Sequence, residues 1–182
     1  MICAISVTGK DCTGIIAALT ETIFKTGGNL EDASMTILEG EFAMIVLVAY
    51  KNKKGNQKLI SQLGKIERKM NLTITVKKIM RPLRRGEKHK TGTIPYIVSV
   101  FGKDRSGIVY HVSKLLAQMR LNITDLNSKI TGSGAKTAYT LILEVDVPRS
   151  IRLINRLKRA FNVLQKKLRV HIALSPAEPI QF

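Results

Sequence analysis

The sequence predicts an α+β protein built from two copies of one β-α-β-β-α-β domain, and two observations support this. First, the stretch Gly9-Lys10-Asp11-Cys12-Thr13-Gly14-Ile15 returns ninety-three residues later as Gly102-Lys103-Asp104-Arg105-Ser106-Gly107-Ile108. Second, each copy follows a short apolar run and precedes apolar residues at helical spacing. A repeat at this distance indicates two domains of about eighty residues each.

We expect domains at residues 1–80 and 94–175, a basic linker at 81–93 and a C-terminal tail at 176–182. Alternating and helical apolar patterns predict the elements of each copy. The predicted elements of the first copy are a strand at 2–7, a helix with Ile15, Ile16, Leu19 and Ile23 on its buried face and Gly27 at its end, strands at 33–37 and 42–50 joined by a tight turn at 39–41, a helix with Leu59, Leu63, Ile66 and Met70, and a strand at 72–76.

The second copy repeats this order. Its predicted elements are strands at 96–100, 126–130, 138–147 and 170–174, one helix with Ile108, Val112, Leu115, Leu116 and Met119, and another with Leu153, Leu157, Ala160 and Leu164. A longer turn at 132–136 joins the two middle strands. This element order predicts two ferredoxin-like domains, each with a four-stranded antiparallel sheet and both helices on one face.

Composition narrows the class of protein. The chain has 182 residues, of which 45% are hydrophobic, and a net charge of +17 carried mostly by the linker and second copy. Such a charge favours anionic partners. Two cysteines, Cys3 and Cys12, make no disulfide framework, and we expect a reducing cytoplasm. A first strand starting at Ile2 leaves no room for a secretory signal, and no apolar run approaches the roughly 20 residues that span a bilayer.

The repeated loop joins the first strand of each copy to its first helix. The first turn of a helix has unpaired backbone N–H groups and partial positive charge, so a carboxylate or phosphate can bind there. Thr13 and Ser106, just before the second glycine, are placed to cap the helix. The alternative is an ordinary strand-to-helix turn in which Asp11 and Asp104 cap their own helices.

A second repeated signal is an Asn-apolar-x-Asp motif, fifteen residues after the second glycine. It holds Asn29 and Asp32 in the first copy and Asn122 and Asp125 in the second. We expect it in the turn after the first helix, where an Asn can also bond its own turn. If two domains pack edge to edge, the loop of one faces this turn of the other. The cleft then offers N–H groups for a carboxylate and oxygens for an ammonium, as a free amino acid requires.

Together, G-K-D-x-x-G-I, the helix and the Asn-apolar-x-Asp turn resemble the ACT domain, a regulatory module that usually binds amino acids. The tandem pair is similar to the glycine cleavage system transcriptional repressor family, and to the amino-terminal regulatory part of formyltetrahydrofolate deformylase without its catalytic domain. The resemblance implies a ligand between two domains. The implied ligand-binding residues are Asp11, Cys12, Thr13, Gly14, Ile15, Asn29 and Asp32, with Asp104, Arg105, Ser106, Gly107, Ile108, Asn122 and Asp125. Because Cys12 in the first loop corresponds to Arg105 in the second, the two loops are chemically unequal, and we expect one of the two sites to be altered or empty.

Catalysis is not expected. His89, His111 and His171 lie in the linker, on a helix and in the last strand, without a repeated partner at metal spacing. No nucleophile is paired with a base. We therefore predict a non-catalytic protein without a cofactor or metal, which binds an amino acid such as glycine or serine and acts on a protein partner, either a transcription factor or an enzyme. A homodimer is compatible with this hypothesis, and membrane association is not expected.

Two alternatives stay open. The same element order serves RNA-recognition domains, but aromatic residues are 5% of the chain, which disfavours base stacking. Arg149, Arg152, Arg156 and Arg159 share one helix flank and, with the linker, are candidates for binding a polyanion. More often, such a charged stripe is a solvated outer face. The other alternative is a detached regulatory subunit of a metabolic enzyme.

Overall fold

A computed structural model describes residues 1–51, 53–81, 88–132 and 137–177, and the chain divides into two compact units, Met1–Leu83 and Arg84–Phe182. The elements of the first unit are β1 (Ile2–Lys10), α1 (Ile15–Lys25), β2 (Gly28–Leu38), β3 (Glu41–Tyr50), α2 (Lys53–Met70) and β4 (Leu72–Ile79). Those of the second are β5 (Thr93–Lys103), α3 (Ile108–Gln118), β6 (Asn122–Thr131), β7 (Ala138–Pro148), α4 (Ile151–Leu168) and β8 (Val170–Pro176).

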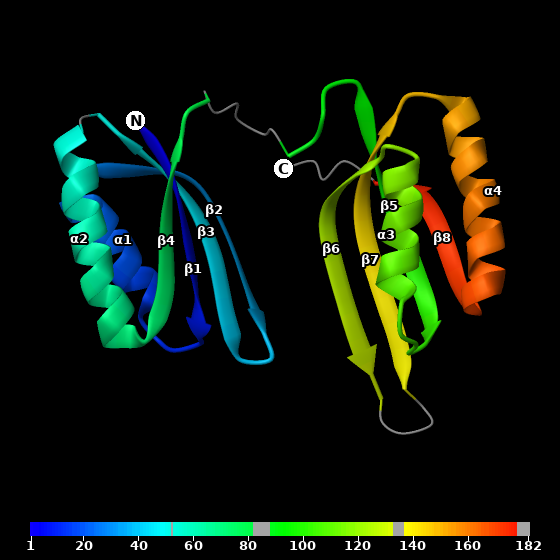
Figure 1. The fold of residues 1–182 in the computed structure, drawn as a ribbon, viewed down its shortest axis with the longest axis horizontal. Coiled ribbons are helices and arrows are strands. Elements are labelled where there is room, and N and C mark those ends of the chain that lie inside the picture. Colours follow the sequence, from blue (N-terminus) through cyan, green and yellow to red (C-terminus); the bar gives the residue numbers. More distant parts are fainter. Residues whose placement is uncertain (52, 82–87, 133–136, 178–182) are drawn as a thin grey trace. The chain divides into compact units, whose positions relative to one another are not determined.

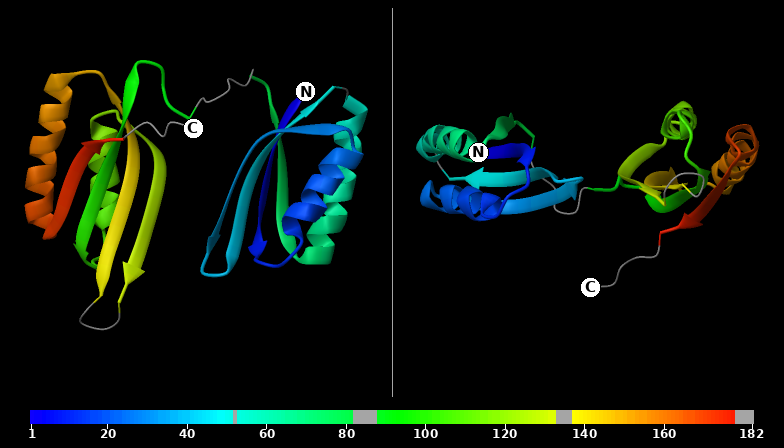
Figure 2. Two further views of the ribbon diagram at one scale, coloured as in Figure 1. Left: turned by 180° about the vertical axis from the view of Figure 1, so that it is seen from behind. Right: turned by 90° about the horizontal axis from the view of Figure 1, so that it is seen from below.

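Each unit is the predicted ferredoxin-like domain. The sheets are antiparallel with strand orders β2-β3-β1-β4 and β6-β7-β5-β8, and in each the two helices cover one face (Figures 1 and 2). The predicted tight turn is confirmed, since Glu39 and Gly40 join β2 to β3 with φ of 51° and 87°. Two residues with positive φ match the twist of a hairpin.

The core of each domain lies between its sheet and its helices. In the first, Ile5, Val7, Leu19, Val46 and Leu59 are at most 1% exposed. The corresponding layer of the second contains Val98, Leu116, Leu141, Leu143 and Leu157, all fully buried. The helical periodicity therefore identified the core faces correctly, with one correction: Ile16 is 44% exposed, because the face it occupies on α1 turns away from the sheet.

Every strand is longer than predicted, and in four of them the added residues include parts of the repeated motifs. β1 continues through Gly9 and Lys10, and β5 extends from Thr93 to Lys103, so the first strand of each domain includes the first glycine of its motif. β2 starts at Gly28 and β6 at Asn122, several residues before the alternating apolar pattern. Most residues before that pattern are polar, which an edge strand tolerates because its hydrogen bonds to one neighbour do not require buried side chains.

The edge strands β2 and β6 carry exposed apolar side chains. Met35 and Ile37 of β2 are 42% and 49% exposed, although they pair with the buried Met44 and Phe42 of β3. On β6, Leu126 and Ile130 are 44% and 56% exposed, and they pair with the buried Leu143 and Tyr139 of β7. Both domains thus present an edge strand whose helix-side face is apolar and uncovered within its own domain.

Within the described residues, none of the four helices has both the length and the apolar character that crossing a membrane requires. Of the predicted turn at 132–136, residues 133–136 lie outside the described residues. So do residues 82–87 of the predicted linker and 178–182 of the predicted tail.

Candidate functional site

The motif loops start their helices without a side-chain cap. The N-cap of α1 is Gly14, with φ of 99°, and that of α3 is Gly107, with φ of 91°. No side chain accepts a capping hydrogen bond from the first-turn N–H groups of either helix, so the predicted capping by Thr13 and Ser106 is wrong, and so is the alternative capping by Asp11 and Asp104. A glycine with positive φ carries the chain into the helix instead. The first-turn N–H groups therefore keep their affinity for an anion.

The two glycines of each motif are needed for different structural reasons. A Cβ on Gly9 would lie 2.8 Å from Leu72 Cδ2, and one on Gly102 would lie 2.9 Å from Val170 Cγ1. The first glycine is thus required because a neighbouring strand passes close to it, and the second because of its φ. In the first copy the loop is held further by the Asp11 N–H, which donates to the Gly40 carbonyl at 2.8 Å.

The remaining loop residues are placed similarly in both copies. Cys12 is an exposed free thiol, and Arg105 at the same place in the second loop is also exposed. Ile15 and Ile108 are 2% exposed and belong to the cores. The loops are therefore chemically unequal at one solvent-facing position and alike at the positions that pack.

The Asn-apolar-x-Asp motif forms a β-bulge, not the turn that the sequence suggested. Asn29 pairs with Ala49 and Leu30 with Val48, but Asp32 pairs with Leu47, so Glu31 is an extra residue. In the second copy Ile123 pairs with Val145 and Asp125 with Glu144, so Thr124 is the extra residue. A bulge bends an edge strand and redirects its side chains.

Polar side chains stabilise both bulges. Asp32 Oδ1 accepts from the Ala33 N–H at 2.8 Å, and Asp125 Oδ1 accepts from the Leu126 N–H at 2.9 Å. Asn29 Nδ2 donates to Glu31 Oε1 at 2.8 Å. The repeat of the Asp therefore has a local structural reason, while its second carboxylate oxygen is available for other contacts.

Within one domain, the loop and the bulge lie at opposite ends of the sheet. The loop follows Gly9, which pairs with Phe42, whereas Asn29 pairs with Ala49, the partner of Ile2. Seven residues of strand separate Ile2 from Gly9, or about 23 Å. One domain alone does not bring the predicted ligand-binding residues together.

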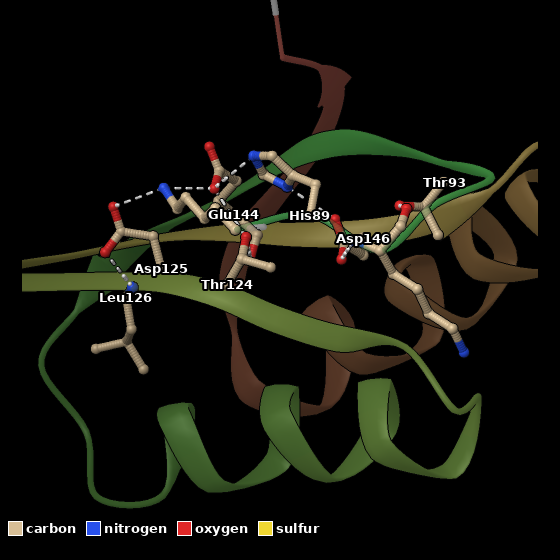
Figure 3. A network of polar contacts seen from close by, with 9 residues as sticks. His89, Thr93, Thr124, Asp125, Leu126, Glu144 and Asp146 are labelled. Carbon is tan, nitrogen blue, oxygen red and sulfur yellow. Dashed lines mark hydrogen bonds and ion pairs between the residues drawn. The ribbon is translucent and has the colours of Figure 1, made fainter. Parts of the chain in front are cut away.

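The second domain has a polar network that the sequence reasoning missed (Figure 3). Its centre is Asp146, which is 3% exposed and accepts hydrogen bonds from the Lys90 N–H at 2.8 Å and from His89 Nδ1 at 2.9 Å. Beside it, Lys88 Nζ lies 2.7 Å from Glu144 Oε1 and 3.8 Å from Asp125 Oδ2. The last residues of the predicted linker are thus anchored on strands β6 and β7.

Lys88 and Glu144 in this network each stabilise the charged form of the other. The hydrogen bond to Glu144 raises the pKa of Lys88, in spite of partial burial. Burial acts to raise the pKa of Glu144, but hydrogen bonds from Lys88 and Thr124 outweigh it and leave that pKa lowered. Thr124 Oγ1, on the bulge, donates to Glu144 Oε1 at 2.8 Å.

The network is specific to the second copy. The first copy has Leu47 and Ala49 at the positions of Glu144 and Asp146. A comparison of the two copies along this strand would have found the change from apolar to acidic residues, next to a basic linker. Asp125, predicted as a ligand-binding residue, is therefore already near a cation, whereas its counterpart Asp32 bonds only to its own strand among the contacts described here.

Three grooves of about 450 to 470 Å³ lie elsewhere. Two lie between helices. One is lined by residues of α3 and α4, and the other by residues of α2 and of the C-terminal end of α1. The third lies at the end of α4 beside β5 and β8. None of these three contains a predicted ligand-binding residue. In the described part of the chain, no three His, Cys, Asp or Glu side chains are grouped to hold a metal ion.

Comparison with known families gives two matches, both described as ACT domain, at residues 2–77 and 96–162. A UPF0237 protein of Neisseria meningitidis is 33% identical over 85 residues, which cover 47% of this chain and 90% of the relative. A UPF0237 protein of Corynebacterium diphtheriae is 36% identical over 77 residues, 42% of this chain and 86% of the relative. These relatives therefore correspond to about one domain of this chain.

Two solved structures resemble the whole chain. One, described as an unknown protein from Galdieria sulphuraria, is 25% identical and has a TM-score of 0.78, and the match covers 97% of this chain and 98% of that one. A protein assigned as a glycine cleavage system transcriptional repressor is 19% identical, has a TM-score of 0.69 and covers 97% of both chains, which shows a shared fold. ACT domains have regulatory, ligand-binding roles, and this chain belongs to the ACT-domain family, with two ACT domains in tandem.

Proposed function

We propose that this protein is a non-catalytic regulator that binds a small free amino acid, of the glycine or serine type, and passes the occupancy to a protein partner. The proposal rests on one observation: the same two features occur in both domains. Each domain has an uncapped helix start after its motif loop and a bulge that holds an Asn and an Asp.

The chemistry of these features matches the two charged ends of an amino acid. The N–H groups at the start of α1 or α3 suit a carboxylate, because the helix dipole adds to the hydrogen bonds. The side-chain oxygens of Asn29 and Asp32, or of Asn122 and Asp125, suit an ammonium. The motif loop leaves little depth for a side chain, since Ile15 or Ile108 next to it is already packed in the core.

Two domains are required for one site, because the loop and the bulge of a single domain lie about 23 Å apart. We propose that ACT domains associate along the edge strands β2 and β6, within one chain or between the chains of a homodimer. The exposed apolar residues Met35 and Ile37 of β2, and Leu126 and Ile130 of β6, support this, since association would bury them.

Signalling then needs no catalysis. Ligand that binds only the associated arrangement shifts the population toward it, and a surface for the partner is exposed or covered. The partner is a transcription factor or a metabolic enzyme. In the second case the chain would be a detached regulatory subunit, with the same ligand site.

Isothermal titration calorimetry against a panel of the free amino acids, in the cytoplasmic pH range, tests the proposal. We expect binding of one small amino acid. Asn29→Ala and Asn122→Ala each remove a hydrogen bond to a charged group, worth about 1.5–3 kcal/mol, so at least one should weaken binding by about 10-fold to 100-fold. Asn155→Ala, an exposed position on α4, is the control and should bind like the wild type. Binding that survives in both bulge variants, or no binding of any amino acid, refutes the proposed site.

A further inference from the structure

The outer face of α4 is strongly basic. Eight basic residues and no acidic residue occur from Arg149 to Arg169. All eight side chains are exposed: Arg149, Arg152, Arg156, Lys158, Arg159, Lys166, Lys167 and Arg169. We call these eight residues the α4 basic face. The corresponding helix of the first domain, α2, includes Glu67 among its basic residues, so the unbroken charge is a property of the second domain.

Four of the basic residues form a strip along one side of α4, which the exposed Val163 interrupts. Arg152, Arg156, Arg159 and Lys166 follow at spacings of 4, 3 and 7, which place them on one side of a helix. At a rise of 1.5 Å per residue, the strip is about 21 Å long. Five of the eight basic residues are Arg, whose planar guanidinium binds phosphate oxygens through two parallel hydrogen bonds.

The opposite side of α4 is not free. Leu157 and Phe161 are 0% and 2% exposed, packed in the core of the second domain. A helix that inserts into a membrane surface needs an apolar face to bury in the lipid. The apolar face of α4 is already used, so a soluble polyanion fits this surface better than a lipid bilayer.

A groove with an exposed aromatic ring adjoins the strip. Its volume is about 450 Å³, and its lining includes Lys166, Arg169, Phe101 and His171. Phe101 of β5 is 57% exposed and is the cross-strand partner of His171 on the edge strand β8. Both side chains lie on the sheet face away from α4, because their neighbours Val100 and Ile172 pack in the core. The first domain has Thr8 and Thr73 at these paired positions.

We propose that the α4 basic face and this groove bind single-stranded nucleic acid. The arginines contact successive phosphates, the nucleic-acid strand then passes the edge at β8 beside Lys166 and Arg169, and a base stacks on Phe101 on the sheet face away from α4. Grooves that combine positive charge with exposed aromatic rings are typical of proteins that bind single strands, and the stacking needs a base that is free of a duplex. This surface uses none of the proposed amino-acid-binding residues, so the two proposals stand or fall independently.

Fluorescence anisotropy of the full chain with a labelled twelve-nucleotide oligouridine tests this. The α4 variant is Arg152→Gln with Arg156→Gln and Arg159→Gln. Its matched control is Lys58→Gln with Lys65→Gln and Lys69→Gln on α2, which removes the same charge from exposed positions of the other domain. We expect the α4 variant to bind at least 10-fold more weakly and to lower the salt dependence by about two counterions, since each lost phosphate contact on a single strand removes about 0.7. The control should stay within about 3-fold of the wild type.

The aromatic contribution is measured with Phe101→Ser. Loss of one stacked base should weaken binding by about 5-fold to 150-fold at constant salt, without a change in the salt dependence. Equal weakening by the α2 and α4 triple variants would overturn the proposal, because net charge alone would then explain binding. So would tighter binding of a duplex of the same length, binding only to phosphatidylserine vesicles, or an unchanged affinity in Phe101→Ser.

Discussion

Replacing Asp146 with alanine should release the end of the linker from the second domain and leave the sheet intact. The Asp146 carboxylate holds the Lys90 N–H and the His89 ring at 2.8 and 2.9 Å. The backbone accepts alanine at this register position, since the first domain has Ala49 there. Lys90 is exposed and His89 half-buried, so water can replace the lost bonds once the segment detaches.

The magnitude follows from the two bonds. A hydrogen bond to a charged group contributes about 1.5–3 kcal/mol, so their loss lowers the free energy for local opening of the segment by about 3 kcal/mol at the low end. Every 1.4 kcal/mol is a factor of ten, so the open population should rise more than 100-fold. The free energy of global unfolding should change much less, because removing a buried carboxylate also removes its desolvation cost.

Hydrogen exchange followed by NMR separates the two effects. The Lys90 amide reports local opening, and the Leu141 amide on the central strand β7 reports unfolding of the sheet. We expect the protection of Lys90 to fall about 100-fold in Asp146→Ala and that of Leu141 to stay within a few-fold. Asp104→Ala, at the opposite end of β5, is the control and should change neither amide.

Two results would refute this reasoning. Equal exchange of the Lys90 amide in wild type and Asp146→Ala would show that the carboxylate does not hold the segment. A parallel loss of protection at Leu141 would show that Asp146 stabilises the sheet as a whole and that the linker contact is secondary.

Three further predictions concern stability, each measured by denaturation of the full chain. The pKa of Glu144 is lowered from its usual 4.5, so its interaction with Lys88 stabilises the second domain above pH 4.5 and is lost as the pH falls through the lowered pKa. In urea titrations at several pH values, Glu144→Gln should therefore reduce the loss of stability at acidic pH, and an unchanged loss would contradict the assignment. Gly14→Ala places a side chain at φ of 99° and should cost about 1–2 kcal/mol, with Gly14→Asn milder; equal stability of all three would show that the loop relaxes. Tyr50→Phe removes the 2.8 Å hydrogen bond between the Tyr50 and Thr26 hydroxyls and should cost about 0.5–1.5 kcal/mol. Thr26→Val should cost more, because the Thr26 hydroxyl also donates to the Thr22 and Ile23 carbonyls; a Tyr50→Phe variant as stable as the wild type would contradict the prediction.

The sequence anticipated the features that depend on near neighbours in the chain. Helical spacing identified Leu59 and Leu63 as core residues, and both are buried. The Glu39-Gly40 turn followed from its flanking strands. The repeated glycines were recognised, but only the structure shows which physical reason applies to each: a close neighbouring strand at Gly9 and a positive φ at Gly14.

The candidate site was predicted less completely. The Asn and Asp residues were found because they recur, but their setting was predicted as a turn. A bulge is a mismatch between two strands, as between Leu30 and Asp32 opposite β3, and the sequence of one strand does not contain it. The ligand-binding role of these residues remains a prediction.

The sequence by itself determined that this protein has two ACT domains. Repeated motifs and apolar periodicity involve residues close together in the chain, so they can be recognised without the tertiary structure. Tertiary structure alone decided which distant side chains meet. Asp146 reaches His89 across 57 residues, and strand register places Phe101 opposite His171. Such contacts depend on register and on the path of the linker, which set the long-range geometry that local sequence patterns leave open.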